Sequence, residues 1–438
     1  MTINIGDTVT FSTNRDVSFW PASDPHPSHS IYSEFDSKEP ISPKNTWSFT
    51  FEKSGIWHFH DHTNPYFNGT INVLDKNGVV QYKCDTNNKE KCWDDYLSLA
   101  VNTGGPKGGL DALSYLMKND PSFVDQGCHA YAHRVGEKSL EYYLSSKKDI
   151  SQWDFPIEST YCGYGFLHGV FEHYFRIKPS FVSEICSELD KKFSSEIPRI
   201  RLNCFHGAGH GFIQDPPEES LWGNVQGIIS PALEKCSKVS PGNNNDEITE
   251  CNEGVFNIIA GWMMSGSYSI SKFDENDPFE LCRNQTSWPY QKACYYELSL
   301  KVNFFGHDNI PELAKRYANK IADNEIAGMV LHSIVASVVQ DTVDKNDFTD
   351  YLLQCRELQE RLHKDCLAAI VGGLMAHGVP QQEYVKPLKL CSSEKMNMTE
   401  KEYCFSQLGA VIKKTYDKGK VSEICLLYPD SYKKYCQL

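Results

Sequence analysis

The side chains best placed for chemistry in this 438-residue sequence are histidines four residues apart. His206 and His210 lie in the stretch CFHGAGHG at residues 204–211. A spacing of four puts two side chains on the same face of a helix, and neutral imidazole is a common ligand of zinc and copper. The stretch therefore predicts a helix that presents two nitrogen ligands together.

Two further pairs have the same spacing, and each lies shortly after a cysteine. Because packed helices lie about 8–10 Å apart, long side chains at matching positions of successive helices can meet. We expect one centre with enough nitrogen and oxygen ligands for one or two ions of zinc, copper or iron. The candidate ligands are His129, His133, His168, Glu172, His206 and His210.

Glycines surround these histidines, although each glycine weakens a helix by about 1 kcal/mol. They predict close helix approach or backbone access to a bound group, and they are Gly163, Gly165, Gly169, Gly207, Gly209 and Gly211. The alternative is that the histidines only hydrogen-bond between tightly packed helices. No catalytic triad, phosphate loop or dinucleotide fingerprint occurs in the sequence, so catalysis would depend on a metal, with Glu172 or His173 as an acid–base group.

The first 76 residues have a different pattern, typical of short strands. Polar and apolar residues alternate in segments 2–11, 46–51, 57–62 and 69–73, with a turn at Gly6. Several short strands in so few residues predict a small antiparallel β-sandwich.

Three motifs in this region resemble a cupredoxin. They are an opening Ile-x-x-Gly-Asp-Thr-Val-x-Phe, a middle His-Ser-Ile-Tyr at residues 29–32, and a closing Gly-x-Trp-x-Phe-x-x-His followed by Gly-x-Ile-x-Val. The resemblance covers about a sixth of the chain. In that family a histidine of the middle strand, with a cysteine and a histidine of the last loop, holds copper. The resemblance implies His29 for the first position and His62 for the loop histidine.

The region departs from the family at the thiolate ligand. No cysteine precedes Cys84, so a blue copper–thiolate site cannot form. Strand alternation points Trp57 and Phe59 inward and puts Asp61 about where the thiolate would be. The expected ligands for Cu(II) or Zn(II) are His29, His60 and His62, with His26 and Asp61 in reserve. The alternative is a sandwich of this kind that has lost its metal.

Composition limits the partners. The hydrophobic share of 40% and the charged share of 23% are ordinary for a folded protein. A formal net charge of −14 without a basic run excludes a nucleic-acid or anionic-membrane surface. No apolar run is long enough to span a bilayer. We expect metal ions as partners, with further copies of the chain or cell-surface proteins as other candidates.

Sixteen cysteines without a single Cys-x-x-Cys favour disulfides over zinc ribbons, and the lack of Cys-x-x-Cys-His excludes c-type haem. Three glycosylation sequons occur, at Asn68, Asn284 and Asn397. The sequence thus predicts a secreted or cell-surface glycoprotein whose signal is not present in this chain. No nucleotide or haem cofactor is expected.

Cysteines that open apolar helical segments recur along the chain. Their spacings lie between 32 and 47 residues, except for one of 72, in which residues 325–335 repeat the pattern without a cysteine. Such a period predicts an α-helical solenoid of two-helix repeats. The cysteines that open helices are Cys92, Cys128, Cys162, Cys204, Cys251, Cys294, Cys366, Cys404 and Cys436.

Most remaining cysteines lie shortly before one of these, across a polar loop. Regular spacing therefore favours eight local bridges. The predicted pairs are Cys84–Cys92, Cys128–Cys162, Cys186–Cys204, Cys236–Cys251, Cys282–Cys294, Cys355–Cys366, Cys391–Cys404 and Cys425–Cys436.

The sequence as a whole predicts a multidomain β + α protein. Residues 1–76 form the cupredoxin-like sandwich, 77–91 a linker, and 92–438 a disulfide-stapled helical repeat domain. The expected function is extracellular metal binding, with copper ahead of zinc. A metal-dependent oxidase or hydrolase centred on the early repeats, and a structural or cell-surface assembly protein, are the alternatives.

Overall fold

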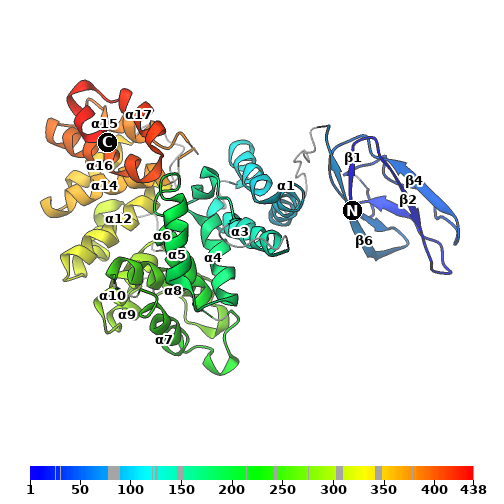
Figure 1. Cartoon of the computed structure of the whole chain (residues 1–438), viewed down its shortest axis with the longest axis horizontal. Coiled ribbons are helices and arrows are strands. Elements are labelled where there is room, and N and C mark those ends of the chain that lie inside the picture. Colours follow the sequence, from blue (N-terminus) through cyan, green and yellow to red (C-terminus); the bar gives the residue numbers. More distant parts are fainter. Residues whose placement is uncertain are drawn as a thin grey trace. The chain divides into compact units, whose positions relative to one another are not determined.

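A computed structural model describes the chain except for residues 25, 30, 77–88, 121, 124–126, 146–151, 214, 241, 243, 275, 302–308, 341–347, 377, 380 and 438. The chain divides into two compact units, Met1–Leu113 and Ser114–Leu438. It is mostly helical, with a small β region at the N-terminus (Figure 1). Most of the predicted linker lies outside the described residues, and α1 (Lys89–Asn119) already begins inside it.

In the described part of the first unit, six strands of 3 to 11 residues form two sheets. The sheet order is β1-β6-β5-β3 in one and β2-β4 in the other. The pairing is antiparallel, as predicted, except that β1 runs parallel to β6. The all-antiparallel prediction is wrong there because β1 and its successor β2 pair in different sheets, so no hairpin joins β1 to its partner. The strands are β1 (Thr2–Asn4), β2 (Thr8–Ser12), β3 (Pro21–Ser23), β4 (Thr46–Thr50), β5 (Gly55–Asp61) and β6 (Asn64–Leu74).

An aromatic core holds this region together. Val9 of β2, Phe35 of the loop after β3 and Trp57 of β5 belong to one buried cluster. Phe59 packs against the same cluster, and its ring centroid lies 5.2 Å from that of Phe11. Trp57 and Phe59 therefore point inward, as strand alternation predicted. His58 and His60, which alternate with them along β5, lie on the opposite face of the strand.

α1 is interrupted at Gly105, where φ is 65° and Pro106 follows. The second unit continues with long and short helices. They are α3 (Cys128–Ser145), α4 (Gly165–Ile177), α5 (Val182–Phe193), α6 (Ile200–Phe212), α7 (Val225–Cys236), α8 (Asn245–Ser265), α9 (Glu280–Arg283), α10 (Trp288–Ser299), α11 (Ile310–Arg316), α12 (Asn324–Gln340), α13 (Thr349–Arg356), α14 (Glu360–Ala376), α15 (Val385–Cys391), α16 (Met398–Thr415), α17 (Lys418–Leu426) and α18 (Lys433–Cys436).

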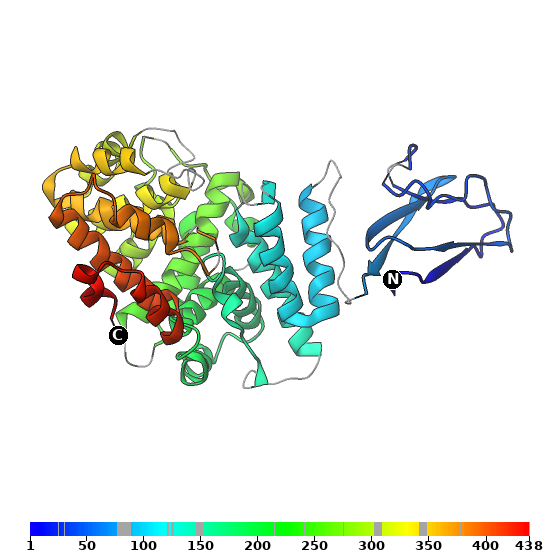
Figure 2. The ribbon, with the colours of Figure 1, turned by 90° about the horizontal axis from the view of Figure 1, so that it is seen from above.

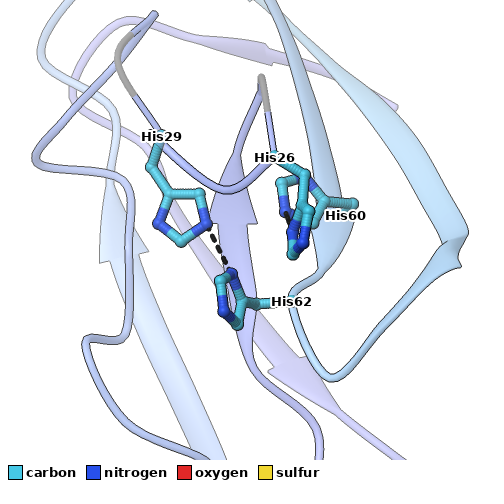
Figure 3. A group of neighbouring side chains, drawn as sticks. All are labelled: His26, His29, His60 and His62. Atoms are coloured by element: carbon cyan, nitrogen blue, oxygen red, sulfur yellow. Dashed lines mark hydrogen bonds between the residues drawn. The ribbon is translucent and has the colours of Figure 1, made fainter.

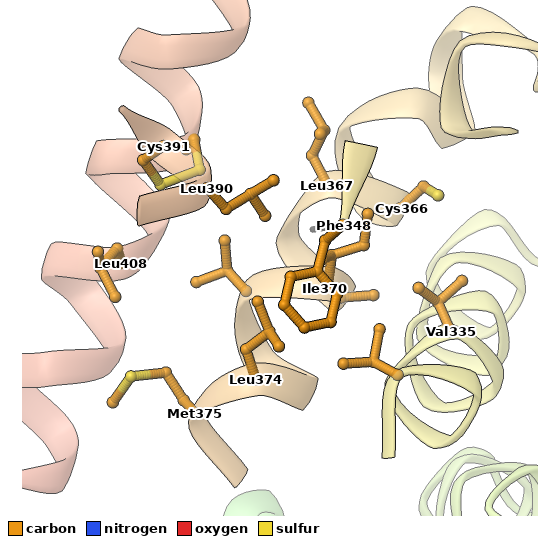
Figure 4. Close-up of a cluster of buried hydrophobic side chains, with 14 of the residues drawn as sticks. Val335, Phe348, Cys366, Leu367, Ile370, Leu374, Met375, Leu390, Cys391 and Leu408 are labelled. Atoms are coloured by element: carbon orange, nitrogen blue, oxygen red, sulfur yellow. A yellow bond between two sulfur atoms is a disulfide. The ribbon is translucent and has the colours of Figure 1, made fainter. Parts of the chain in front are cut away.

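The long helices pack in sequence order. α3 contacts α4, α4 contacts α6, and the series continues through α8, α10, α12 and α14 to α16 (Figure 2). In the later helices a buried cluster joins Val335 of α12, Ile370 of α14 and Leu408 of α16 (Figure 4). Each long helix thus packs against the long helices before and after it in this series, with the shorter helices coming between them in the chain.

Seven of the eight predicted cysteine pairs are disulfide-bonded in the structure. Six of them tie a helix to the next one along the chain across 11 to 18 residues, as Cys186 of α5 does with Cys204 of α6. Cys84 of the eighth pair lies outside the described residues. In the chain-entropy model, a disulfide that closes a loop of this length stabilises the folded chain by about 2–3 kcal/mol.

The prediction that cysteines open the helical segments holds for Cys128, the first residue of α3, but is wrong for most others, because the residues before the cysteine already form the first turns of the helix. Cys204 is the fifth residue of α6 and Cys251 the seventh of α8, and Cys436 is the last residue of the four-residue α18.

Candidate metal centres

Four imidazoles converge in the first unit, and we call this group the head centre. His26 and His29 come from the loop after β3, His60 from β5 and His62 from the turn that follows β5 (Figure 3). Their ligand nitrogens all lie within 4.8 Å of one another. His29 Nε2 is 2.8 Å from His62 Nδ1, and His26 Nδ1 is 3.3 Å from His60 Nε2. The three ligands expected here and the reserve ligand His26 are therefore brought together.

Two carboxylates orient two imidazoles of the head centre, each at the ring nitrogen that faces away from the group. His29 Nδ1 lies 2.7 Å from Asp36 Oδ2, and His60 Nδ1 lies 2.8 Å from Asp24 Oδ1. A carboxylate at one ring nitrogen keeps the proton there and leaves the lone pair on the other nitrogen. In both residues that other nitrogen is the Nε2 that faces the group. Neither carboxylate was predicted from the sequence.

Asp61, the other reserve ligand, is not in the group. Its carboxylate accepts hydrogen bonds from the Trp20 and Thr63 backbone N–H groups, from the Thr63 hydroxyl and, at 2.5 Å, from Arg15. Although burial opposes ionisation, these bonds hold the pKa of Asp61 below its usual range. Strand alternation misplaced it because the register of β5 against β6 shifts between His60 and Asp61.

The surroundings of His62 favour its neutral form. Burial, and then repulsion from His29, His26 and His60, lowers the pKa of His62. Asp36 stays ionised: burial opposes it, but hydrogen bonds from Trp20, Lys38 and His29 lower its pKa. A neutral imidazole is the form that binds a metal cation.

All six ligands predicted in the helices come together in the second unit, and we call this group the helical centre. α3, α4 and α6 each contribute two of them, because residues four apart share a helix face and the three helices pack in sequence. They form three overlapping triads whose donor atoms lie within 4.8 Å. The triads are His129/His133/His168, His168/His206/His210 and His133/Glu172/His210.

Neutral backbone and amide groups orient two of these imidazoles. His129 Nδ1 lies 2.6 Å from the carbonyl oxygen of Cys162, and His168 Nε2 lies 2.9 Å from Asn203 Oδ1. Each oxygen accepts a hydrogen bond from the ring N–H, which keeps the proton on that nitrogen, so the free lone pair is on His129 Nε2 and on His168 Nδ1. His129 Nε2 in turn lies 3.1 Å from His133 Nε2.

Burial decides the protonation of the helical centre. Burial, then repulsion from His133, lowers the pKa of His129 to about 3. Burial also lowers the pKa of His133, His168 and His206. Glu172 is the counter-example: burial opposes its charge, but contacts with His133 and His210 hold its pKa far below the usual range. Burial thus favours the neutral form of these four imidazoles beside one carboxylate anion, which also accepts from Arg176 at 2.7 Å.

Two acidic residues that the sequence analysis missed extend the helical centre. Glu253 of α8 and Glu297 of α10 form a fourth triad with His206. Burial raises the pKa of Glu297 to about 7, and burial together with Glu250 raises that of Glu253. A signal existed: Glu253 follows its helix cysteine by two residues, as His206 does, and Glu297 follows its own by three.

The glycines explain how the helices approach closely enough. A Cβ at Gly169 of α4 would overlap with the carbonyl oxygen of His133, and one at Gly209 of α6 with that of Cys251. These helices meet backbone to backbone at the positions that carry the donors. The prediction of close helix approach is confirmed at these two positions.

His173 lies outside the four triads, and its Nε2 pairs with Glu137 Oε1 at 3.0 Å. Asn68, Asn284 and Asn397, the predicted glycosylation sites, are all exposed. None of the helices in the described part of the chain has the length and apolar content needed to cross a membrane.

Comparisons with protein-family models, with curated proteins and with solved structures find no match to this chain.

Proposed function

We propose that this protein is an exported metal-binding protein that holds copper, with zinc as the alternative, at two separate histidine centres. The observation that carries the proposal is the head centre. Four imidazoles converge there, and two of them have a carboxylate at the far ring nitrogen. Histidines that bind metals almost always have such a partner, which sets the tautomer and raises the basicity of the ligand nitrogen.

Three of the donor spacings match two ligands of one ion, whereas His29 Nε2–His62 Nδ1 at 2.8 Å and His129 Nε2–His133 Nε2 at 3.1 Å are ordinary hydrogen-bond distances. Two donors about 2.1 Å from a tetrahedral ion lie roughly 3.4 Å apart. His26 Nδ1 and His60 Nε2 are 3.3 Å apart, and Glu172 Oε2 is 3.4 Å from His133 Nδ1 and 3.5 Å from His210 Nδ1. The last two exceed the usual range for a hydrogen bond, about 2.7–3.2 Å.

The donor types favour copper or zinc. Imidazole nitrogen suits Cu(II) and Zn(II), whereas magnesium and calcium prefer oxygen. Since the head centre has no thiolate, a copper site there is not of the blue type. We extend the proposal to a cupredoxin-like sandwich for the strands and a solenoid for the packed helices. The disulfides support export to an oxidising compartment.

Elemental analysis of the protein after gentle purification tests the proposal. We expect bound copper or zinc, lost from the head in a His29→Ala/His62→Ala variant and kept in a His58→Ala control. His58 is the matched control because it lies on β5 beside His60 but bonds to Thr70 Oγ1 instead of joining the group. Purified protein that neither contains nor takes up copper or zinc would exclude metal binding.

A second candidate function is metal-dependent catalysis at the helical centre, as an oxidase or hydrolase. It is favoured by Glu297, because a carboxyl with a pKa of about 7 can give or take a proton near neutral pH. A hydrolase of this type would lose activity in Glu297→Gln, and the metal content of the variant separates loss of an acid–base group (metal kept) from loss of a ligand in the triad with His206 (metal reduced). If the unmodified protein and Glu297→Gln turn over substrate equally fast, Glu297 is not the acid–base group.

A further inference from the structure

His210 occupies a shared position in the helical centre. It belongs to the triad with His133 and Glu172 and also to the triad with His168 and His206. Its ring centroid lies 5.1 Å from that of His133 and 5.0 Å from that of His206. One imidazole is therefore close to two sets of donors.

Among the residues that the structure describes, neither ring nitrogen of His210 has a hydrogen-bond partner, although the residue is only 1% exposed. An unpaired polar atom in the interior costs about 1–3 kcal/mol. The rings of His129 and His168 each have a protein acceptor for one nitrogen, so His210 differs from them in this respect. A ligand at each nitrogen would remove both unpaired atoms at once.

The surroundings of Nδ1 suit an ion. Glu172 Oε2 lies 3.5 Å from His210 Nδ1 and 3.4 Å from His133 Nδ1. Both separations are long for hydrogen bonds and close to the roughly 3.4 Å between two ligands of one tetrahedral ion. Nδ1 therefore belongs with Glu172 and His133, which leaves Nε2 for the triad with His168 and His206.

We propose that the helical centre holds two divalent transition-metal ions that share His210 as a bridging imidazolate. One ion is held by His210 Nδ1, His133 and Glu172, and the other by His210 Nε2, His168 and His206. The inference rests on the proposed function, because it assumes that this centre binds metal.

The bridge has a definite proton balance. A neutral imidazole carries one N–H and one lone pair, so it can bind one ion without losing a proton. Binding the second ion breaks the remaining N–H bond and forms the second nitrogen–metal bond, and the proton passes to solvent water. No electron is transferred. Two adjacent dications stabilise the imidazolate anion, since a bound cation is the largest local charge in such a site.

The test uses the full chain with the head disabled by His29→Ala/His62→Ala, titrated with Cu(II). We expect two copper ions per chain and an electron paramagnetic resonance spectrum with magnetic coupling between them. His210→Ala in the same background is expected to bind at most one ion and to lose the coupling. His173→Ala is the matched control: it lies on α4 outside the triads, so both ions and the coupling should remain.

The outcomes separate this inference from the proposed function. One uncoupled ion in the head-disabled protein, or two uncoupled ions, overturns the bridge but leaves metal binding intact. No ion at all overturns metal binding at the helical centre. If His210→Ala fails to fold by circular dichroism, the copper count and coupling of the head-disabled protein with His210 intact still decide. Two coupled ions in a folded His210→Ala protein also contradict the bridge.

Discussion

The head centre and the helical centre are both built from histidines, yet they are supported in different ways. In the head, the carboxylates of Asp24 and Asp36 orient two rings, and His26 is exposed. In the helices, a backbone carbonyl and an amide orient two rings, and His210 is almost fully buried. The difference is one of exposure and of hydrogen-bond partners: the head centre includes an exposed ring, whereas the helical centre includes one closed off from solvent. We therefore expect the head to exchange metal readily and the helical centre to retain it.

The largest effect should come from removing ligands at one centre only. In His29→Ala/His62→Ala the head loses two of its four ligands, and we expect no head-bound ion while the helical ions remain. Equilibrium dialysis with radioactive or isotopically labelled metal measures this. If helical binding falls to the same degree, the two centres are not independent and the comparison fails.

Acid should destabilise the metal-free helical unit. The pKa of His129 is lowered from about 6.5 to about 3 by burial. Its folded form is thus neutral, and its contribution to stability is complete above about pH 6.5 and lost as pH falls toward 3. We expect a loss on the order of a few kcal/mol across this window, measured by urea unfolding of metal-free protein.

The acid experiment needs a background without Glu297, because the contribution of Glu297 to folding stability changes with pH in the opposite direction. Because its pKa is raised to about 7, its contribution is complete below about pH 4.5 and lost as pH rises through about 7. Glu297→Gln removes this pH-dependent contribution and keeps a side-chain oxygen that can accept the hydrogen bond from Asn257 Nδ2. Stability of the Glu297→Gln protein that is flat between pH 6.5 and 3 would contradict neutral burial of His129.

Helix contact at the helical centre can be tested with one methyl group. A Cβ at Gly209 would overlap with the Cys251 carbonyl, so Gly209→Ala should destabilise by about 1–3 kcal/mol and weaken helical metal binding. Gly261→Ala is the matched control, because nothing lies within 4 Å of its Cβ, and it should be neutral or stabilise by roughly 0.4–1 kcal/mol. Urea unfolding measures the change in stability for both variants. Equal changes in Gly209→Ala and Gly261→Ala would contradict the close-contact explanation. The head centre should be unchanged in both.

A single carboxylate tests the support of the head. Asp36→Asn keeps the shape but weakens the partner of His29 Nδ1, and we expect about 10–100-fold weaker head binding. Glu34→Gln is the control, since this exposed carboxylate pairs with Lys53 instead. Unchanged affinity in Asp36→Asn, measured by competition with a chelator, would show that Asp36 is a structural residue only.

The residues that meet in the helical centre were predictable because two regularities coincide in them. The spacing of four places each pair on one face, and the repeated offset from a cysteine aligns the faces of successive helices. Glu253 and Glu297 carried the second regularity only, and without a paired ligand on the same helix they were overlooked.

The head centre was less predictable because loops have no periodicity. His26, His29, Asp24 and Asp36 lie in or beside the irregular segment between β3 and β4, where no spacing rule says which side chains meet. Alternation did place Trp57 and Phe59 correctly along β5. It failed at Asp61 because a register shift breaks the two-residue period there.

The disulfide pattern has a consequence for proteolysis. Each of the six short bridges joins cysteines on either side of one inter-helix connection, as Cys282 and Cys294 do around exposed Asn284. Exposed connections are the preferred sites of proteolytic cleavage. A cut inside any of these six segments leaves the two fragments covalently joined, so the chain keeps its full mass until it is reduced. In an environment rich in proteases, the helical unit would thus tolerate nicks that would release fragments from an unbridged chain.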